Sequence, residues 1–217
     1  MIRRICWRKY KFKKHVNNFE EKYIFLGRGK TLINDERIHD NIIDANLHIL
    51  SQHFPNIHSF STHLRHSKNV DFTGIYKRNL DLRNFELIFS PTNPPDHWAL
   101  LVITTKKETE DDWYLQTTYY DSSEKHNFDA EWEMILKIFK KNAEEFNYKF
   151  NEEKSKVIQE KCPNQTDITS CGIFVIMVAQ YIAQKQKIDF THEHIRFFRR
   201  KIAIELLTGN LILKGGT

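Results

Sequence analysis

Hydrophobic residues recur at helical spacing over residues 38–54 and again over residues 128–147, and each stretch predicts an amphipathic helix. In the first stretch, Asp40 is placed to cap the opening turn and Pro55 follows the end. The polar positions of both stretches fall together on the opposite side, so each helix is expected to pack one face against a core.

Short runs of β-branched and aromatic residues between these helices predict strands. Residues 85–91 read FELIFSP, residues 97–105 read HWALLVITT, and residues 113–121 read WYLQTTYYD. The middle run is almost continuously apolar, which is typical of a strand buried on both faces. The charged sequence KKETEDD after it predicts that the second and third runs form a hairpin. KVIQE, at residues 156–160, predicts one more strand, whereas residues 55–85 show no firm period.

The most apolar stretch lies near the carboxyl end of the chain. Residues 171–186, which begin CGIFVIMVAQYIA, are too long for a strand and too short to cross a bilayer, so they predict a buried helix. A last helix is expected over residues 191–209, with Thr191 as a candidate cap and Gly209 after its end. This order of helices and strands predicts an α+β domain.

Composition places the chain among ordinary globular proteins. Its 217 residues are 40% hydrophobic and 28% charged, which suits one domain and is too apolar for a disordered chain. The first residues lack the apolar core of a secretory signal, so we expect a soluble intracellular protein, nuclear or cytoplasmic, or one acting in a host cell if it is a pathogen effector. Three cysteines are too few for a disulfide framework and are expected to be free thiols.

The formal charge of +5 is unevenly distributed. Residues 1–30 hold ten Lys or Arg and two Glu, a net charge of +8, whereas residues 31–217 hold 23 basic and 26 acidic residues, a net charge of −3. We interpret residues 1–30 as a basic extension and residues 31–217 as the folded domain. The extension could contact nucleic acid, an anionic partner or an import receptor, and it could equally be a solvated tail with no dedicated partner.

Cys171 stands at the head of the predicted buried helix, directly after the polar loop CPNQTDITS. The positive end of a helix and its unpaired N–H groups stabilise a thiolate, so this position favours a reactive cysteine. Gly172 is expected to keep the approach to the thiol open and to let the loop turn sharply, and Ser170 is a candidate cap. Taken alone, such a cysteine is more often a small buried structural residue.

A nucleophilic cysteine needs a base beside it and a group that orients the base. Among eleven histidines, His97 differs because it opens the predicted buried strand, where a sheet edge would hold it; the others, including His126, give no sharper signal than a surface imidazole. Asp121 ends the returning strand, so an antiparallel hairpin brings it next to His97. Three other acids are rivals for this role. Asp96 is next to His97 in the sequence, whereas Asp111 and Asp112 lie at the opposite end of the hairpin.

Gln165 precedes Cys171 by six positions, and its amide could donate to the same oxyanion as the Cys171 backbone N–H. Four short motifs thus stand in one order: His97-Trp98, Asp121-Ser122, Gln165 and Cys171-Gly172. This order, together with the 50 positions from Asp121 to Cys171, resembles the ubiquitin-like-protein-processing (ULP) cysteine protease family. The similarity covers roughly residues 31–208.

The resemblance implies a papain-like α+β fold with a central, mostly antiparallel sheet. It implies that His97 is the general base, Asp121 the acid that orients it, Cys171 the nucleophile and Gln165 the oxyanion donor, while Trp98 walls a narrow channel for a Gly-Gly tail. The implied activity is a cysteine peptidase or isopeptidase that cleaves after the C-terminal Gly-Gly of ubiquitin or a SUMO-like modifier. Its partners would be that modifier and its conjugates, with no cofactor, metal or membrane.

The chain departs from the family pattern at three places. The family usually carries Trp-Leu-x-Asp at its first helix, and the candidates here, TLIND and RIHD, both lack the tryptophan. KKETEDD lengthens the connection from His97 to Asp121, and Ser170 stands where many members have Asp. Two other functions fit the same residues: an acetyltransferase of the same clan, or a catalytically degenerate protein that binds a modifier or nucleic acid.

Overall fold

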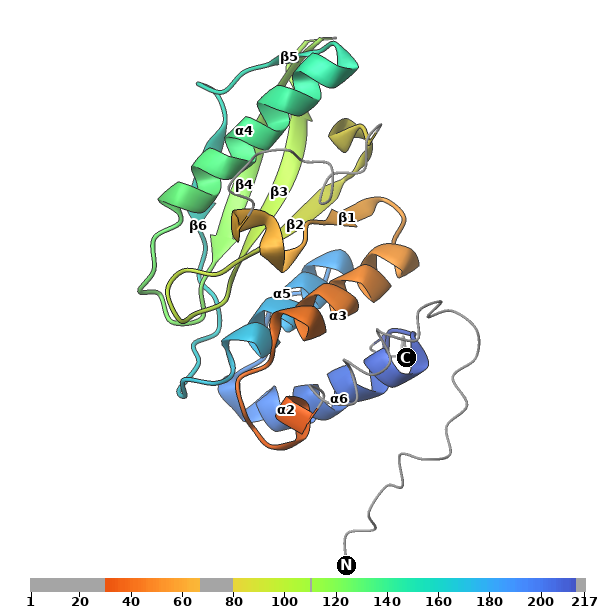
Figure 1. Cartoon of the computed structure of the whole chain (residues 1–217), viewed down its shortest axis with the longest axis vertical. Coiled ribbons are helices and arrows are strands. Elements are labelled where there is room, and N and C mark those ends of the chain that lie inside the picture. Colours follow the sequence, from red (N-terminus) through yellow and green to blue (C-terminus); the bar gives the residue numbers. More distant parts are fainter. Residues whose placement is uncertain (1–29, 67–79, 110, 214–217) are drawn as a thin grey trace, which may run out of the picture.

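A six-stranded sheet with helices on both faces forms the centre of the protein in the computed structural model, which describes residues 30–66, 80–109 and 111–213 (Figure 1). Apart from Lys30, the predicted basic extension lies outside the described residues. The α-helices are α2 (Lys30–Ile33), α3 (Asp40–His53), α4 (Asp129–Phe146), α5 (Cys171–Ala183) and α6 (Ile195–Thr208). The strands are β1 (Ile57–Ser59), β2 (Leu87–Thr92), β3 (Ala99–Lys107), β4 (Asp112–Tyr120), β5 (Lys149–Phe150) and β6 (Lys156–Gln159). The same described residues also contain three 3-10 turns: η2 (Thr62–His66), η3 (Leu82–Asn84) and η4 (His192–His194).

The α+β fold class is confirmed, and the sheet is mixed. Its strands run in the order β1-β2-β3-β4-β5, and β6 also pairs with β4. The longest ladders, β2 with β3 and β3 with β4, are antiparallel, so the predicted hairpin is present. The shorter outer pairings, β1 with β2 and both β5 and β6 with β4, are parallel. The sequence did not predict β1 or β5, which are too short to show a period.

Burial on both faces explains the continuous apolar run in β3. Leu100 and Val102 pack with α3, α5 and α6, whereas Leu101 and Ile103 point to the opposite face and pack with α4. Figure 1 shows α4 across one face of the sheet and α5 and α3 on the other. No helix within the described ranges is both long enough and apolar enough to cross a membrane.

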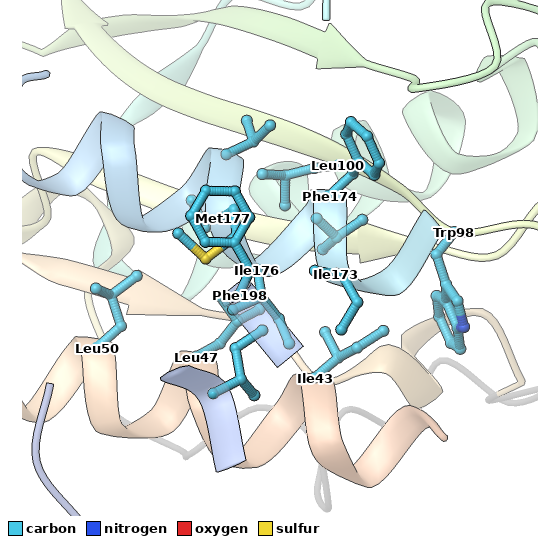
Figure 2. Close-up of a cluster of buried hydrophobic side chains, with 14 of the residues drawn as sticks. Ile43, Leu47, Leu50, Trp98, Leu100, Ile173, Phe174, Ile176, Met177 and Phe198 are labelled. Atoms are coloured by element: carbon cyan, nitrogen blue, oxygen red, sulfur yellow. The ribbon is translucent and has the colours of Figure 1, made fainter. Parts of the chain in front are cut away.

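Helix α5 lies between the sheet and α3, which is why it is apolar all round. Each of its residues from Cys171 to Tyr181 is buried. Figure 2 shows Phe174 of α5 beside Leu100 of the sheet, with Leu47 of α3 on the other side of the helix. The predicted buried helix is thus the centre of the larger hydrophobic cluster, and the candidate nucleophile begins it.

A polar network is buried within this helical layer. Glu205 of α6 is 0% exposed, and its Oε2 accepts hydrogen bonds from Asn46 Nδ2 of α3 at 3.1 Å and from Gln180 Nε2 of α5 at 2.8 Å. Its Oε1 accepts from the ammonium of Lys201 and from the backbone N–H of Ile212, the latter at 2.9 Å. One carboxylate therefore links three helices through hydrogen bonds.

Two predicted helix caps have other roles in the structure. Asp40 is the first residue of α3 and follows the capping position, which His39 occupies; its Oδ1 accepts from the N–H of Asn41 at 2.7 Å. Thr191 forms a capping box with His194, but this box closes the short turn η4, and α6 starts after it. Both corrections shift a helix start by one turn or less.

The two glycines singled out by the sequence serve different purposes. Gly209 ends α6 with a φ of 67°, the left-handed conformation that commonly terminates a helix, as predicted. Gly172 is the second residue of α5 and makes no sharp turn. A Cβ added there would lie 2.6 Å from Ile38 Cγ1 and 3.3 Å from Ile43 Cδ1, so the absent side chain allows α5 to pack closely against α3 and against Ile38, two residues before α3.

Gly172→Ala is therefore expected to destabilise the protein by about 1–3 kcal/mol, because the added methyl overpacks the contact with Ile38. At an uncrowded helix position the same change would stabilise by about 1 kcal/mol. Urea denaturation measures the difference, and Lys137→Ala, at an exposed position of α4, is the control, expected within about 0.5 kcal/mol of the wild type. A Gly172→Ala variant as stable as the wild type would contradict the packing argument.

Candidate active site

His97 and Asp121 meet at one end of the β3–β4 hairpin. The pairing of Leu100 with Tyr120 places the residues before β3 beside those after β4. His97 Nε2 lies 2.7 Å from Asp121 Oδ1, and both side chains are buried. His97 precedes β3 by two residues and does not open it, but the contact that the hairpin predicts is present.

Two of the three rival acids face other partners. Asp112 begins β4 at the far end of the hairpin, where its Oδ2 lies 3.2 Å from Lys149 Nζ. Asp96 has a fully exposed carboxylate, 3.7 Å from the guanidinium of Arg37. Asp121 is thus the acid that the fold brings to the candidate base.

The loop after β4 folds around the Asp121 carboxylate. Besides His97, Oδ1 accepts from the N–H and the hydroxyl of Ser123, at 2.8 and 2.9 Å. Oδ2 accepts from the N–H groups of Lys125 and His126, both at 3.1 Å. Burial by itself raises the pKa of Asp121, but the hydrogen bonds from His97 and from the loop outweigh burial and lower the pKa. The carboxylate is therefore charged and held in one orientation.

Cys171 is fully buried at the N-terminus of α5, and His97 is the side chain that lowers the pKa of its thiol most. Because Asp121 takes Nε2 of His97, Nδ1 is the ring nitrogen available to the sulfur. Burial raises the pKa of Cys171, but the hydrogen bond and charge of His97, the N–H of Trp98 and the charge of Arg37 outweigh burial and lower the pKa.

The same contacts act on His97 in the opposite direction. Burial lowers the pKa of His97, but hydrogen bonds to Asp121 and Cys171, together with their charges, raise it to about 9. A base whose pKa is raised next to a thiol whose pKa is lowered favours transfer of the proton from sulfur to nitrogen. The arrangement therefore stabilises a thiolate–imidazolium pair, the reactive form of a cysteine nucleophile.

Gln165 is held beside Ser122, the residue that follows Asp121. The Ser122 hydroxyl donates to Gln165 Oε1 at 2.7 Å, and the Gln165 N–H donates to the Ser122 carbonyl at 2.9 Å. Gln165 Nε2 donates to the carbonyl of Asp167 at 2.7 Å, which uses one of its two N–H groups. The loop thus fixes the amide at the acid end of the site.

Asp167 organises the turn that leads into Cys171. Its Oδ1 accepts from the Ser170 N–H at 3.0 Å and its Oδ2 from the Ser170 hydroxyl at 2.7 Å. Ser170 therefore binds the turn with its side chain and does not cap α5 with it, which corrects the expectation. Arg199, only 2% exposed, donates to the Thr169 carbonyl from the other side at 3.4 Å.

Trp98 lies where the hydrophobic core meets the site. Its side chain is 7% exposed and sits at the edge of the cluster in Figure 2, near Ile173. With Arg37 and His97, it also lines a polar cleft of about 450 Å³. Arg37 belongs to RIHD, so RIHD rather than TLIND borders the site.

Cys162, the other described free thiol, is also buried. Burial raises its pKa to about 12, and the charges of Asp121 and Glu124 act in the same direction. The thiol is therefore protonated at neutral pH and unsuited to nucleophilic attack. Cys6 lies outside the described residues.

His126 is the residue at this site that the sequence reasoning missed. Its ring stacks on that of His97 with centroids 4.3 Å apart and planes 10° from parallel. Its Nδ1 also lies 3.2 Å from Asp121 Oδ2. The one signal in the sequence is the turn motif DSS at residues 121–123, which indicates that the chain folds back but does not say which side chain returns.

Comparison with known proteins decides the family. The model of the Ulp1 protease family, C-terminal catalytic domain, matches residues 33–211. The chain belongs to the Ulp1 protease family. The family resemblance drawn from the four motifs is thereby confirmed.

Curated relatives agree with the Ulp1 family assignment. Sentrin-specific protease 2 of Homo sapiens is 25% identical over 203 residues, which cover 87% of this chain and 33% of that protein. Ubiquitin-like-specific protease 1 of Saccharomyces cerevisiae is 26% identical over 188 residues, which cover 84% of this chain and 29% of that protein. The chain thus spans about a third of the length of these relatives.

Solved structures share the Ulp1 fold. The C-terminal Ulp1 protease domain, solved in complex with Smt3, the yeast ortholog of SUMO, has a TM-score of 0.68 at 24% identity, covering 85% of this chain and 82% of that one. The Chaetomium thermophilum Ulp1-like SUMO protease catalytic domain has a TM-score of 0.61 at 17% identity, covering 92% and 93%. At these identities, the similarity shows the fold.

Proposed function

We propose that this protein is a cysteine peptidase or isopeptidase that cleaves after the C-terminal Gly-Gly of a ubiquitin-like modifier, with a SUMO-like modifier as the first candidate. The observation that carries the proposal is the buried array in which His97 contacts both Asp121 and Cys171. The choice of modifier is supported by the relatives, which are named sentrin-specific and ubiquitin-like-specific proteases.

In the first half of the reaction, the Cys171 thiolate attacks the carbonyl carbon of the terminal glycine. The carbonyl oxygen becomes an oxyanion, and the second N–H of the Gln165 amide is the group proposed to donate to it; such a donor is worth about 3–4 kcal/mol in other proteases. The His97 imidazolium then gives its proton to the leaving amine as the C–N bond breaks. The product is a thioester between the modifier and Cys171.

In the second half, water attacks the thioester while His97 accepts a proton from it. The C–S bond breaks, and the modifier leaves with a free carboxylate. Asp121 keeps the ring oriented and stabilises the imidazolium in both halves without itself taking a proton. Trp98, beside the polar cleft, would wall the path of a tail that has no side chains.

The test is covalent labelling by modifier probes that carry an electrophilic C-terminus. A SUMO-like probe is expected to label the wild type, and Cys171→Ala is expected to abolish the adduct. Cys162→Ala is the matched control, because the raised pKa of the Cys162 thiol keeps it protonated, and this variant should label as the wild type does. Absence of labelling by SUMO, ubiquitin and other modifiers, in folded protein, would overturn the proposal.

A further inference from the structure

A second imidazole stands beside the His97–Asp121 pair. His126 Nδ1 lies 3.2 Å from Asp121 Oδ2 and 3.0 Å from the Ser123 hydroxyl, and its side chain is 26% exposed. Its backbone N–H donates to the same Oδ2 at 3.1 Å. The two oxygens of one carboxylate thus face two histidines, Oδ1 toward His97 and Oδ2 toward His126.

These contacts define where the protons lie. A carboxylate only accepts hydrogen bonds, so a ring nitrogen that faces Asp121 must carry a proton. The Ser123 hydroxyl donates to Asp121 Oδ1 at 2.9 Å, which leaves its lone pairs to accept from His126. His126 is therefore an Nδ1–H donor, shared between Asp121 and Ser123.

The stacked rings add a constraint that the hydrogen bond alone does not supply. His97 must keep Nε2 on Asp121 while it acts on the Cys171 thiol, and a tilt of its ring disturbs this arrangement. The face of His126, 4.3 Å away and within 10° of parallel, blocks a tilt toward that side.

The cluster of His97, Asp121 and His126 suits hydrogen bonds better than it suits a metal ion. His97, Asp121 and His126 do bring ligand atoms within 4.8 Å of one another. However, parallel stacked rings direct their nitrogen lone pairs along parallel planes, whereas zinc requires ligands that converge on one point at about 2.0–2.2 Å. The separations of 2.7 and 3.2 Å from the carboxylate fit hydrogen bonds.

We propose that His126 is a positioning residue, which holds the Asp121 carboxylate through Nδ1–H and supports the face of the His97 ring. The inference rests on the proposed cysteine-protease function and deepens it. His126 acts through Asp121 and His97 and does not touch the substrate.

Three substitutions separate the two contacts. His126→Ala removes both the donor and the ring, His126→Asn keeps a side-chain N–H near the position of Nδ1, and His126→Phe keeps the ring without the N–H. We expect His126→Ala to lower kcat by about 10-fold or more with little change in KM, because misplaced catalytic groups slow chemistry more than binding. The apparent pKa in the pH profile of Cys171 alkylation by iodoacetamide should move upward. His126→Asn, which keeps a donor, and His126→Phe, which keeps the ring, should each recover part of the loss.

The pH profile distinguishes positioning from a merely structural role. Partial unfolding would reduce the active fraction, visible as a lower melting temperature, and leave the profile of the folded molecules unmoved. A His126→Ala variant whose alkylation profile does not shift, or whose kcat lies within twofold of that of the wild type, would overturn the proposal. So would a loss of kcat that the unfolded fraction accounts for.

Alkylation requires no modifier, so the two proposals can fail separately. If no modifier is cleaved but His126→Ala shifts the alkylation profile, the positioning role stands and the substrate assignment fails. If modifiers are cleaved and the profile does not shift, the positioning role fails alone.

Discussion

Asp121→Asn is expected to lower kcat by about 10³–10⁴-fold with KM changed far less, which is the usual cost of losing the acid of a catalytic triad. The Asp121 carboxylate accepts hydrogen bonds from His97, from Ser123 and from two further backbone N–H groups. An asparagine carries one oxygen and one NH2 group. At one of the two positions where Asp121 accepts hydrogen bonds, the NH2 group would therefore face other N–H groups. The neutral amide also cannot stabilise the His97 imidazolium.

Alkylation of Cys171 reports the same change without a substrate. In the wild type, the lowered pKa of the thiol keeps the rate high at pH values below the ordinary thiol value of 9.0. In Asp121→Asn, the pKa of His97 falls from about 9, the thiolate loses its charged partner, and the profile shifts upward.

Asp121→Asn should also change how the stability of the fold depends on pH. The folded protein raises the pKa of His97 from 6.5, so this group stabilises the fold fully below pH 6.5, and the contribution is lost as the pH rises through about 9. The folded protein lowers the pKa of Asp121 from 3.8, so its contribution is present above pH 3.8 and is lost as the pH falls further. In urea denaturation at a series of pH values, Asp121→Asn should reduce both the loss of stability at high pH and the loss at low pH.

Asp111→Asn is the matched control, because Asp111 is exposed at the other end of the hairpin. It should keep wild-type kcat and the wild-type alkylation profile. Asp121→Asn with kcat within tenfold of the wild type would contradict the assignment of Asp121 as the orienting acid.

Glu205→Ala is expected to have the largest effect on stability, a loss of about 3–5 kcal/mol in the free energy of unfolding. The change would leave the largely buried Lys201 ammonium without its counter-charge, and it would remove the acceptor of Asn46 Nδ2 and one of the two acceptors of Gln180 Nε2. A buried charge or amide without a partner costs far more than the net gain from an intact pair. Urea denaturation measures the loss.

Two further variants identify the source of this loss of stability. Glu205→Gln keeps the shape and one carbonyl oxygen, so it should lose less than Glu205→Ala. Glu133→Ala removes an exposed glutamate from α4 and should stay within about 0.5 kcal/mol of the wild type. If Glu205→Ala lay within 1 kcal/mol of the wild type, roughly one hydrogen bond in net stability, the network would not hold the three helices together.

Local patterns in the chain were enough to predict the main helices and the central strands. Apolar spacing of three and four residues marks α3 and α4, and the unbroken apolar runs mark β3 and α5, because burial acts on each segment separately. The strands that went unpredicted, β1 and β5, have three and two residues, too few to show a period. Their pairing depends on the neighbouring strand that happens to lie beside them.

The candidate triad was also largely predictable. A hairpin forces His97 and Asp121 to the same end because antiparallel pairing is a local consequence of two adjacent strands. The place of Cys171 at a helix start follows from the polar-to-apolar change in the loop before it. The roles of Gly172 and Ser170 could not be predicted from the sequence. Gly172 depends on its contact with Ile38, and Ser170 on the carboxylate of Asp167, and local spacing identifies neither partner.

Contacts between polar groups from different helices, strands and loops are decided only by the tertiary structure. Nothing in the periodicity of α6 distinguishes Glu205 from a surface glutamate, and its partners lie 159 and 25 positions away. His126 likewise resembles a surface histidine until the loop after β4 closes on Asp121. Hydrophobic burial is written into the chain as a pattern because it acts on whole faces of helices and strands, whereas a hydrogen bond joins two particular atoms whose meeting depends on the path of every loop between them.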